Sequence, residues 1–127
     1  LKIIPLPYWT KDRCQASYKN NVVPEHVICA GGAEGVDTCR GDSGGPLTLI
    51  KASTELWGVT SAGNTHCGTK NSPGFYTNVA YHLDWIKTII LLPATSSAWY
   101  LTKTTVDNSL LAYSEPTGRI AGCCYQT

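Results

Sequence analysis

Hydrophobic positions along this chain fall into short runs that glycine, proline and polar clusters separate. Four runs have the length and the β-branched and aromatic content of strands: residues 27–30, 46–50, 55–63 and 74–79. Residues 1–9 alternate loosely, and Pro5 and Pro7 should interrupt them, which favours an edge strand or a strand end. The pattern therefore predicts an all-β domain with many turns.

Two segments carry the signals of helices. Thr10 can cap a short helix that has Asp12 in its first turn and runs to about Tyr18. Residues 81–92 place apolar side chains at helical spacing, and Pro93 should end this second helix. The second helix is too short and too polar to predict a transmembrane span.

The composition changes after Pro93. Residues 93–127 are rich in Ser and Thr, yet they keep large apolar side chains: Trp99, Tyr100, Leu101, Leu110, Leu111, Tyr113 and Tyr125. A disordered tail usually has fewer aromatic residues. We therefore predict one domain over residues 1–92 and an ordered extension of unknown role over residues 93–127, lying on the surface.

Charge and cysteine content narrow the class of protein. Charged residues make up 15% of the chain and the net charge is +1, so charge favours neither nucleic acid nor an anionic membrane as a partner. The six cysteines include no C-x-x-C pair and no Cys/His group at zinc spacing. Disulfides are the better interpretation, free buried thiols being the alternative, and they indicate an oxidising compartment. Six cysteines allow about fifteen connectivities, which sequence alone does not distinguish.

The stretch Gly41-Asp42-Ser43-Gly44-Gly45 places a serine among glycines, as expected of an activated nucleophile. One motif with this spacing, the G-x-S-x-G elbow, must follow a strand and precede a helix. Here residues 37–40 are not apolar, and a strand follows from Pro46. A downstream His and Asp do exist, as His82 and Asp84, but they lie on different faces of the predicted helix. The context of an elbow is therefore missing.

The longer stretch CRGDSGGPL resembles the signature around the nucleophile of trypsin-like, chymotrypsin-fold serine proteases. The resemblance extends over about residues 1–91 and includes CQASYKNNVVPEHVICAGG and the C-x5-P-G-x-Y pattern of CGTKNSPGFY. It implies part of the second six-stranded antiparallel barrel of the double β-barrel, ending in an α-helix. It also implies a serine endopeptidase that works through an acyl-enzyme.

The resemblance assigns roles to individual residues. Ser43 would be the nucleophile, and the N–H groups of Gly41 and Ser43 would form the oxyanion hole. Asp42 matches the carboxylate that pairs with the new N-terminal ammonium after zymogen cleavage, a turn or capping role being the alternative. Asp37 matches the floor of a specificity pocket for Arg or Lys, a solvated loop acid being the alternative. Other residues that match this pocket are Thr38, Ser61, Gly63, Gly74 and Tyr76.

The same resemblance implies two disulfides, Cys14–Cys29 and Cys39–Cys67. It also exposes departures from the family pattern. Ala62 stands where a tryptophan is usual, so we expect the upstream substrate subsites to be wider and weaker. Pro73 stands where sodium-activated relatives carry a tyrosine, so we expect no sodium site, and the resemblance implies no other metal and no cofactor.

The general base of such a protease has no counterpart in this chain. In the family, the catalytic His and Asp lie upstream of the serine, in the first barrel. His26, His66 and His82 are interpreted as surface or capping residues. We therefore expect this chain alone to be inactive and its partner to be a separate N-terminal half that carries His and Asp. Because a vicinal disulfide is strained, one of Cys123 and Cys124 should pair with that half.

Two functions remain open at this stage. The first is a secreted endopeptidase, made as a zymogen, that cleaves protein substrates after Arg or Lys outside the cell or in a secretory granule. Acrosin-like proteases also carry tails after the terminal helix, a comparison that rests on architecture alone. The alternative is an inactive serine-protease-like binding or structural protein in a larger assembly. The intact GDSGG and Asp37 favour the first; Ala62 and the extension favour the second. A disulfide-stapled domain without protease ancestry is a third, weaker interpretation.

Overall fold

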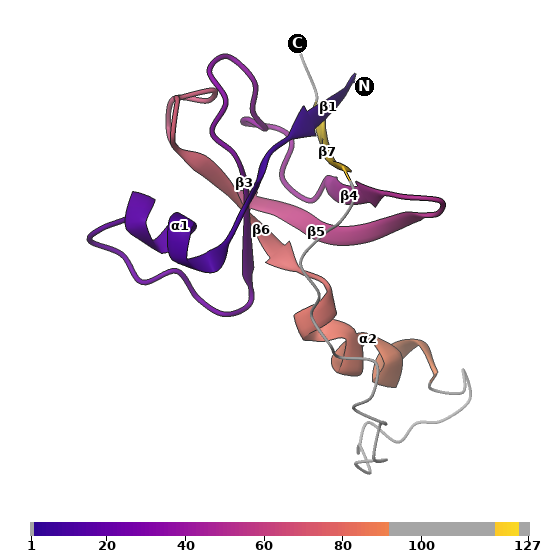
Figure 1. Ribbon diagram of the computed structural model, residues 1–127. Coiled ribbons are helices and arrows are strands. Elements are labelled where there is room, and N and C mark those ends of the chain that lie inside the picture. Colours follow the sequence, from indigo (N-terminus) through magenta and orange to yellow (C-terminus); the bar gives the residue numbers. More distant parts are fainter. Residues whose placement is uncertain (1, 92–118, 125–127) are drawn as a thin grey trace.

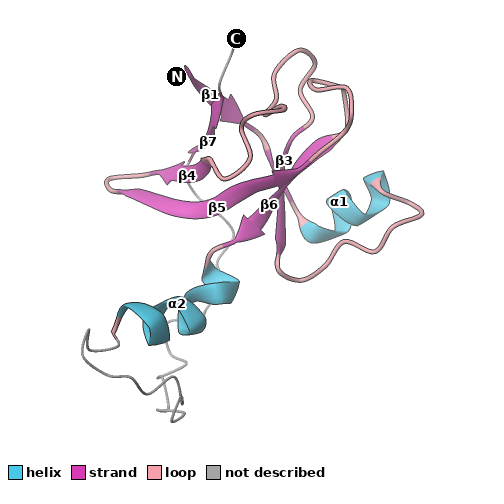
Figure 2. Ribbon diagram, turned by 180° about the vertical axis from the view of Figure 1, so that it is seen from behind, coloured by secondary structure: helices cyan, strands magenta, loops and turns pink. Residues whose placement is uncertain are grey.

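The computed structural model describes residues 2–91 and 119–124, which build one antiparallel sheet with two short helices (Figures 1 and 2). The strands are β1 (Lys2–Leu6), β2 (Tyr8–Trp9), β3 (Val27–Gly31), β4 (Pro46–Ile50), β5 (Thr54–Ala62), β6 (Pro73–Asn78) and β7 (Arg119–Cys124). The helices are α1 (Lys11–Ser17) and α2 (Leu83–Ile90), the latter preceded by a 3₁₀ turn, η1 (Ala80–His82). The prediction of a mainly β domain ending in a helix is confirmed.

The sheet closes on itself. Its strand order is β1-β7-β4-β5-β6-β3-β2, yet β1 and β2, at the two ends of this order, are separated in the chain by Pro7 alone. The N–H of Gly31 donates to the Pro7 carbonyl at 2.9 Å, which holds the junction against β3. If residues 2–9 are counted as one interrupted strand, they and the five strands β3 to β7 make six strands. Six is the number expected for the barrel.

The interior of the barrel is apolar because alternate residues of each strand point inward. In β4, Leu47 and Leu49 are fully buried, whereas the neighbouring Ile50 is exposed. The buried residues of this core are Leu6, Ile28, Ala30, Leu47, Leu49 and Tyr76. Burying one such leucine contributes about 1.5–3 kcal/mol, so this cluster is a substantial source of stability for the barrel.

A smaller cluster fixes α1 against the sheet. Thr10 caps the helix, its hydroxyl accepting a hydrogen bond from the Arg13 N–H at 3.4 Å. Cys14, on the buried side of α1, forms a disulfide with Cys29 of β3. Trp9 packs into the same cluster and donates from its indole N–H to the Gly31 carbonyl at 2.8 Å. Both the predicted helix and the first disulfide are confirmed.

The terminal helix follows the barrel but leaves several of its large apolar side chains exposed. Its amphipathic pattern is as predicted, although the first turn is η1 and the α-helix itself ends at Ile90. No residue of α2 is buried; the exposed fraction is 63% for Trp85 and 70% for Ile90, and Leu91 just beyond is 76% exposed. Among the described helices, none is long and apolar enough to cross a membrane.

The segment predicted as a surface extension contributes a strand to the barrel. Residues 93–118 and 125–127 lie outside the described part of the chain. The structure therefore bears on the predicted extension only over β7. Here Ala121 and Gly122 are buried, and β7 lies between β1 and β4 (Figure 1). This position differs from the expected surface because the segment pairs with strands distant in sequence. The predicted disulfide of Cys123 or Cys124 with another chain stays a prediction.

Candidate active site

The loop that carries Ser43 joins β3 to β4 and is shaped by glycines. Gly41 and Gly44 have φ values of +97° and +84°, in the left-handed region that favours glycine. The loop is anchored to β5 by two backbone hydrogen bonds of 2.9 Å, from Gly44 N–H to the Thr60 carbonyl and from Thr60 N–H to the Gly45 carbonyl. Ser43 is thereby presented to solvent at a fixed place.

Asp42 closes this loop from the inside. Its side chain is buried, and one carboxylate oxygen accepts a hydrogen bond from the Cys39 N–H at 2.7 Å. Its own N–H donates to the Cys39 carbonyl at 3.0 Å, so the turn is bound at both ends. Hydrogen bonds to a carboxylate are stronger than neutral ones, which makes Asp42 a determinant of the loop conformation. Its pairing with a new N-terminal ammonium stays a prediction.

Two backbone N–H groups are the candidate oxyanion donors: that of Gly41 and that of Ser43 itself. Among the described residues, no backbone hydrogen bond uses the N–H of Gly41 or of Ser43. Donors available beside a hydroxyl are the arrangement that stabilises an oxyanion formed by attack of that hydroxyl on a carbonyl. The loop geometry is therefore compatible with the oxyanion hole that the resemblance implies.

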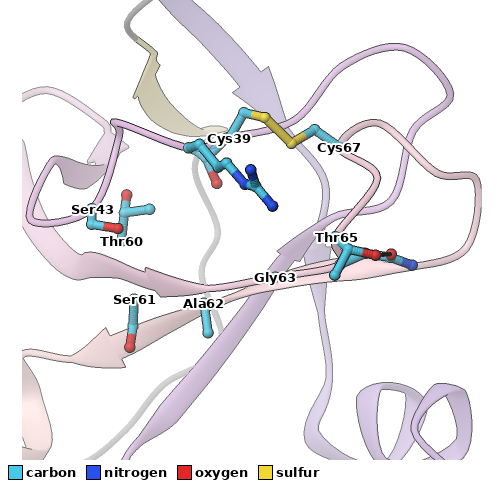
Figure 3. A pocket seen from close by; sticks show the side chains of 11 residues that line it. Cys39, Ser43, Thr60, Ser61, Ala62, Gly63, Thr65 and Cys67 are labelled. Carbon is cyan, nitrogen blue, oxygen red and sulfur yellow. Dashed lines mark hydrogen bonds between the residues drawn. A yellow bond between two sulfur atoms is a disulfide. The ribbon is translucent and has the colours of Figure 1, made fainter.

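Ser43 faces a pocket of about 250 Å³ between its own loop and the end of β5 (Figure 3). In Figure 3, Ser43 and Thr60 lie together at one side of the pocket, Thr65 lies at the opposite side, and the Cys39–Cys67 disulfide runs along the top. Of the residues predicted for the specificity pocket, the structure brings three to this lining: Thr38, Ser61 and Gly63.

The other three predicted pocket residues, Asp37, Gly74 and Tyr76, lie behind this lining. The carboxylate of Asp37 accepts hydrogen bonds from the N–H of Thr38 at 2.9 Å and of Gly68 at 3.1 Å. Gly74 lies beside Asp37: a Cβ built on it would be 3.6 Å from a carboxylate oxygen, an ordinary van der Waals contact. Tyr76 is fully buried, and its hydroxyl lies 2.9 Å from that of Thr38. Together they form a polar second wall behind Thr38.

Asp37 is electrostatically unusual. Burial raises the pKa of its carboxyl above the ordinary value of 3.8, and the hydrogen bonds from Gly68 and Thr38 oppose this shift. A half-buried carboxylate has lost part of its hydration, and a nearby cation would compensate by favouring the ionised form. The site is thus suited to a positively charged group.

The Cys39–Cys67 disulfide joins the serine loop to the loop that follows β5. Its Cα atoms are 5.6 Å apart, and its sequence separation is 28 residues. Gly68, next to Cys67, is also the residue that donates to Asp37. The disulfide therefore fixes the carboxylate and the serine loop relative to one another, and the second implied pairing is confirmed.

Sequence reasoning missed Thr60. Its hydroxyl lines the pocket, is buried, and has no hydrogen-bond partner among the described residues. An unpartnered buried hydroxyl costs about 1–3 kcal/mol, which a polar group in the pocket would offset. The available signal was alternation: Thr60 follows Gly58 by two in β5, on the buried face where an apolar residue is usual.

None of the described residues that line the pocket is a candidate general base. The rings of His26 and His82 lie 6.2 Å apart beside Tyr81, and His66 contacts the hydroxyl of Thr65 at 3.2 Å. None of the three lines the pocket with Ser43, nor does any Asp or Glu among the described residues. The site can orient a nucleophile and an oxyanion, but it does not hold a group that would take the serine proton.

The family model described as Trypsin matches residues 1–86, two thirds of the chain, including the serine loop and the pocket. The chain belongs to the trypsin family. Its trypsin-like nucleophile loop, its two disulfides and its half of the chymotrypsin-type double barrel are features of that membership. Since the match ends at residue 86, β7 lies outside it.

Individual serine proteases are similar to about two thirds or more of this chain. Human kallikrein-8 is 43% identical over 90 residues, covering 71% of this chain and 31% of the relative. The CLIP domain-containing serine protease B15 of Anopheles gambiae is 43% identical over 94 residues, covering 72% and 26%. The solved structure of neuropsin, a serine protease expressed in mouse brain, is 36% identical with a TM-score of 0.58, covering 67% and 36%. The chain thus spans only 26–36% of the length of these three relatives.

Proposed function

We propose that this trypsin-family chain carries the nucleophile, the oxyanion hole and the primary specificity pocket of a serine endopeptidase. The observation that carries the proposal is that Ser43 lines a pocket behind whose wall Asp37 lies, in a glycine-shaped loop whose Gly41 and Ser43 N–H groups make no backbone hydrogen bond. The Ser43 hydroxyl attacks the substrate carbonyl carbon while its proton passes to a histidine of the partner. The oxyanion is held by the N–H groups of Gly41 and Ser43; the amine leaves with that proton, and water hydrolyses the acyl-enzyme.

The preferred substrates carry Arg or Lys before the scissile bond. Asp37 lies immediately behind Thr38 in the pocket wall, and its charge acts through protein of low dielectric rather than through bulk water. Gly63 leaves the approach open, since it brings no side chain into the pocket. A guanidinium or ammonium entering here would stabilise the ionised carboxylate, whose pKa burial has raised. The charge pairing therefore selects cationic side chains.

The partner is the N-terminal half of the same protease domain, as a separate chain that supplies His and Asp. Two observations support it: no described residue in the pocket lining is a base, and Trp85 and Ile90 of α2 and the adjoining Leu91 are exposed. Large exposed apolar groups of this kind mark surfaces that another part of a protein covers.

The two disulfides favour an extracellular location or a secretory granule such as an acrosome. Residues 1–92 are then the protease part and residues 93–127 an appended segment.

An inactive binding protein is the second candidate. The absence of a base in the pocket favours it, and so does Ala62, which leaves the rim above the pocket open. In this case the pocket would bind a cationic segment without cleaving it. The two candidates differ in whether Ser43 reacts.

Labelling with a fluorophosphonate probe distinguishes them. In the native assembly, the probe should modify Ser43, because attack on phosphorus needs the same base and oxyanion hole as attack on a carbonyl. Peptide mapping locates the label, and Ser43→Ala is the control. Benzamidine should block labelling by occupying the pocket beside Asp37. An assembly that contains the N-terminal half, has been activated, and still resists the probe establishes the inactive candidate.

Gly41→Ala should slow this labelling by about 10²–10³-fold, since it disturbs one oxyanion donor. The φ of +97° at Gly41 is strained for alanine, although a Cβ there would meet no atom within 4 Å. Gly35→Ala is the matched control: its φ is +74°, its surroundings are equally open, and it does not line the pocket. If both variants lose the same labelling rate, the loss comes from strain and not from the oxyanion hole.

A further inference from the structure

The strand β7 occupies an unusual place. It comes from beyond the part of the chain that matches the trypsin family, yet it lies inside the sheet with a neighbour on each side. Its residues pair in register with β1 from Lys2↔Cys124 to Leu6↔Ile120, and with β4 from Leu47↔Gly122 to Ile50↔Arg119. The matched part alone thus forms five of the six strand positions of the barrel.

Without β7, the barrel would contain an open slot. Both β1 and β4 run antiparallel to β7, so they run parallel to each other with one strand position between them. Two strand spacings amount to roughly 9–10 Å, too far for direct hydrogen bonds. The slot therefore presents two rows of backbone donors and acceptors that an extended segment can pair with.

The slot also selects its occupant by size. At Gly122, a Cβ would lie 2.8 Å from a methyl carbon of Leu6 and 3.3 Å from the methyl carbon of Thr38. Ala121, the preceding residue, is 5% exposed. Any side chain at the register position of Gly122 would require Leu6 and Thr38 to shift, so this position favours a small residue and disfavours a large one. Since Thr38 also lines the pocket, the occupant of the slot touches the wall of the candidate active site.

The geometry points to a strand-binding site between β1 and β4 whose occupant exchanges. β7 fills the site within the chain, and an extended segment of the polypeptide that completes the protease domain replaces it on assembly. The choice of this partner rests on the proposed function, whereas the slot itself does not. Backbone pairing supplies affinity and the Gly122 position supplies selectivity. Because β7 is tethered, a competing segment must overcome a high effective concentration.

The exchange is tested first with a peptide and the full chain. The probe is a fluorescent peptide of residues 117–126 with Cys123→Ser and Cys124→Ser. It should bind the full-length Gly122→Leu variant at least about tenfold more tightly than the wild-type chain, in which β7 already fills the slot. The same peptide carrying Gly122→Leu is the matched control and should not bind. Equal binding to both chains, or binding of the control peptide, overturns the proposal.

Hydrogen exchange on the unmodified chain keeps the test independent of the variant's folding. Amides of residues 119–124 should exchange as slowly as those of β4, and fast exchange throughout this segment overturns the assignment of β7 to the slot. In the assembly used for labelling, these amides should exchange faster than in the isolated chain. Unchanged protection there overturns the replacement. A wild-type dimer with the segment protected would identify a second copy as the occupant and overturn the proposed partner. None of these readouts depends on Ser43 reactivity, so they fail separately from the proposed function.

Discussion

Asp37→Asn should lower kcat/KM for substrates with Arg or Lys before the scissile bond by about 10⁴-fold. A loss on this scale is expected when a substrate and a site built to pair with it no longer form that polar interaction. The carboxylate is half-buried, and its two oxygens are already oriented by Thr38 and Gly68. An asparagine keeps the shape and removes the charge, so a bound guanidinium would lose its counter-ion in a place with little water. The measurement compares two peptide substrates that differ only in having Arg or Leu at that position, with the assembled protein. A loss that is equal for both substrates would place the effect on folding and not on charge selection.

The same substitution has an opposite effect on stability. The pKa of Asp37 is raised in the folded chain, so its contribution to stability is fully present below about pH 3.8 and is lost as the pH rises through the folded-state pKa. At neutral pH, the Asp37→Asn chain should therefore be the more stable one in urea unfolding, and the difference should disappear in acid. Benzamidine affinity of the wild type should rise over the same pH range. Glu34→Gln, in an exposed loop nearby, is the control and should change neither. A variant less stable than wild type at neutral pH would contradict the burial argument.

Removing the disulfide between Cys39 and Cys67, by alanine at both positions, should lower the free energy of unfolding by about 3–4 kcal/mol. The bond closes a separation of 28 residues, and its loss frees the unfolded chain more than the folded one. It should also abolish most labelling at Ser43, because the serine loop and the Gly68 loop that orients Asp37 would no longer be fixed to each other. Urea unfolding and the labelling rate measure the two effects.

The Cys14–Cys29 disulfide provides the matched control. It closes 15 residues and lies in the cluster around α1, away from the pocket. Its removal should cost a comparable free energy of unfolding, about 3 kcal/mol, and leave the labelling rate of the folded assembly nearly unchanged. If the two double variants lose labelling in parallel, the Cys39–Cys67 bond acts only through global stability.

The strand predictions succeeded where local pattern was sufficient. Residues 46–50 coincide with β4, and the two following strands are each shifted by one residue. Two prolines were expected to interrupt residues 1–9, but only Pro7 does so. Pro5 lies within β1, whose only ladder among the described residues is with β7, and a strand paired on one side tolerates a missing N–H. Which N–H a ladder uses depends on the pairing partner.

The candidate site was likewise predicted in part. Ser43, Gly41 and the disulfide partners are encoded by a compact motif, and the structure brings Ser43 together with Thr38, Ser61 and Gly63. Asp37 was expected on the pocket floor and lies behind the lining, while Thr60 was not expected at all. Both differences concern how deep a side chain lies relative to the pocket lining. This depth depends on how the strands curve against each other and not on residue type.

By itself, the sequence determined the elements whose signals are local: the alternation of β4, the cap of α1, the glycines around Ser43 and the disulfide-rich, trypsin-like motif. Only the tertiary structure decided that β7 enters the barrel between β1 and β4, and that α2 leaves Trp85 and Ile90 exposed. It also decided that a half-buried Asp37 lies behind the pocket lining and that a buried Thr60 lies within it. The physical reason is that periodicity reports which face of a segment is apolar. The surface that will cover that face, and the strand that will pair with its edge, come from residues far away in the chain.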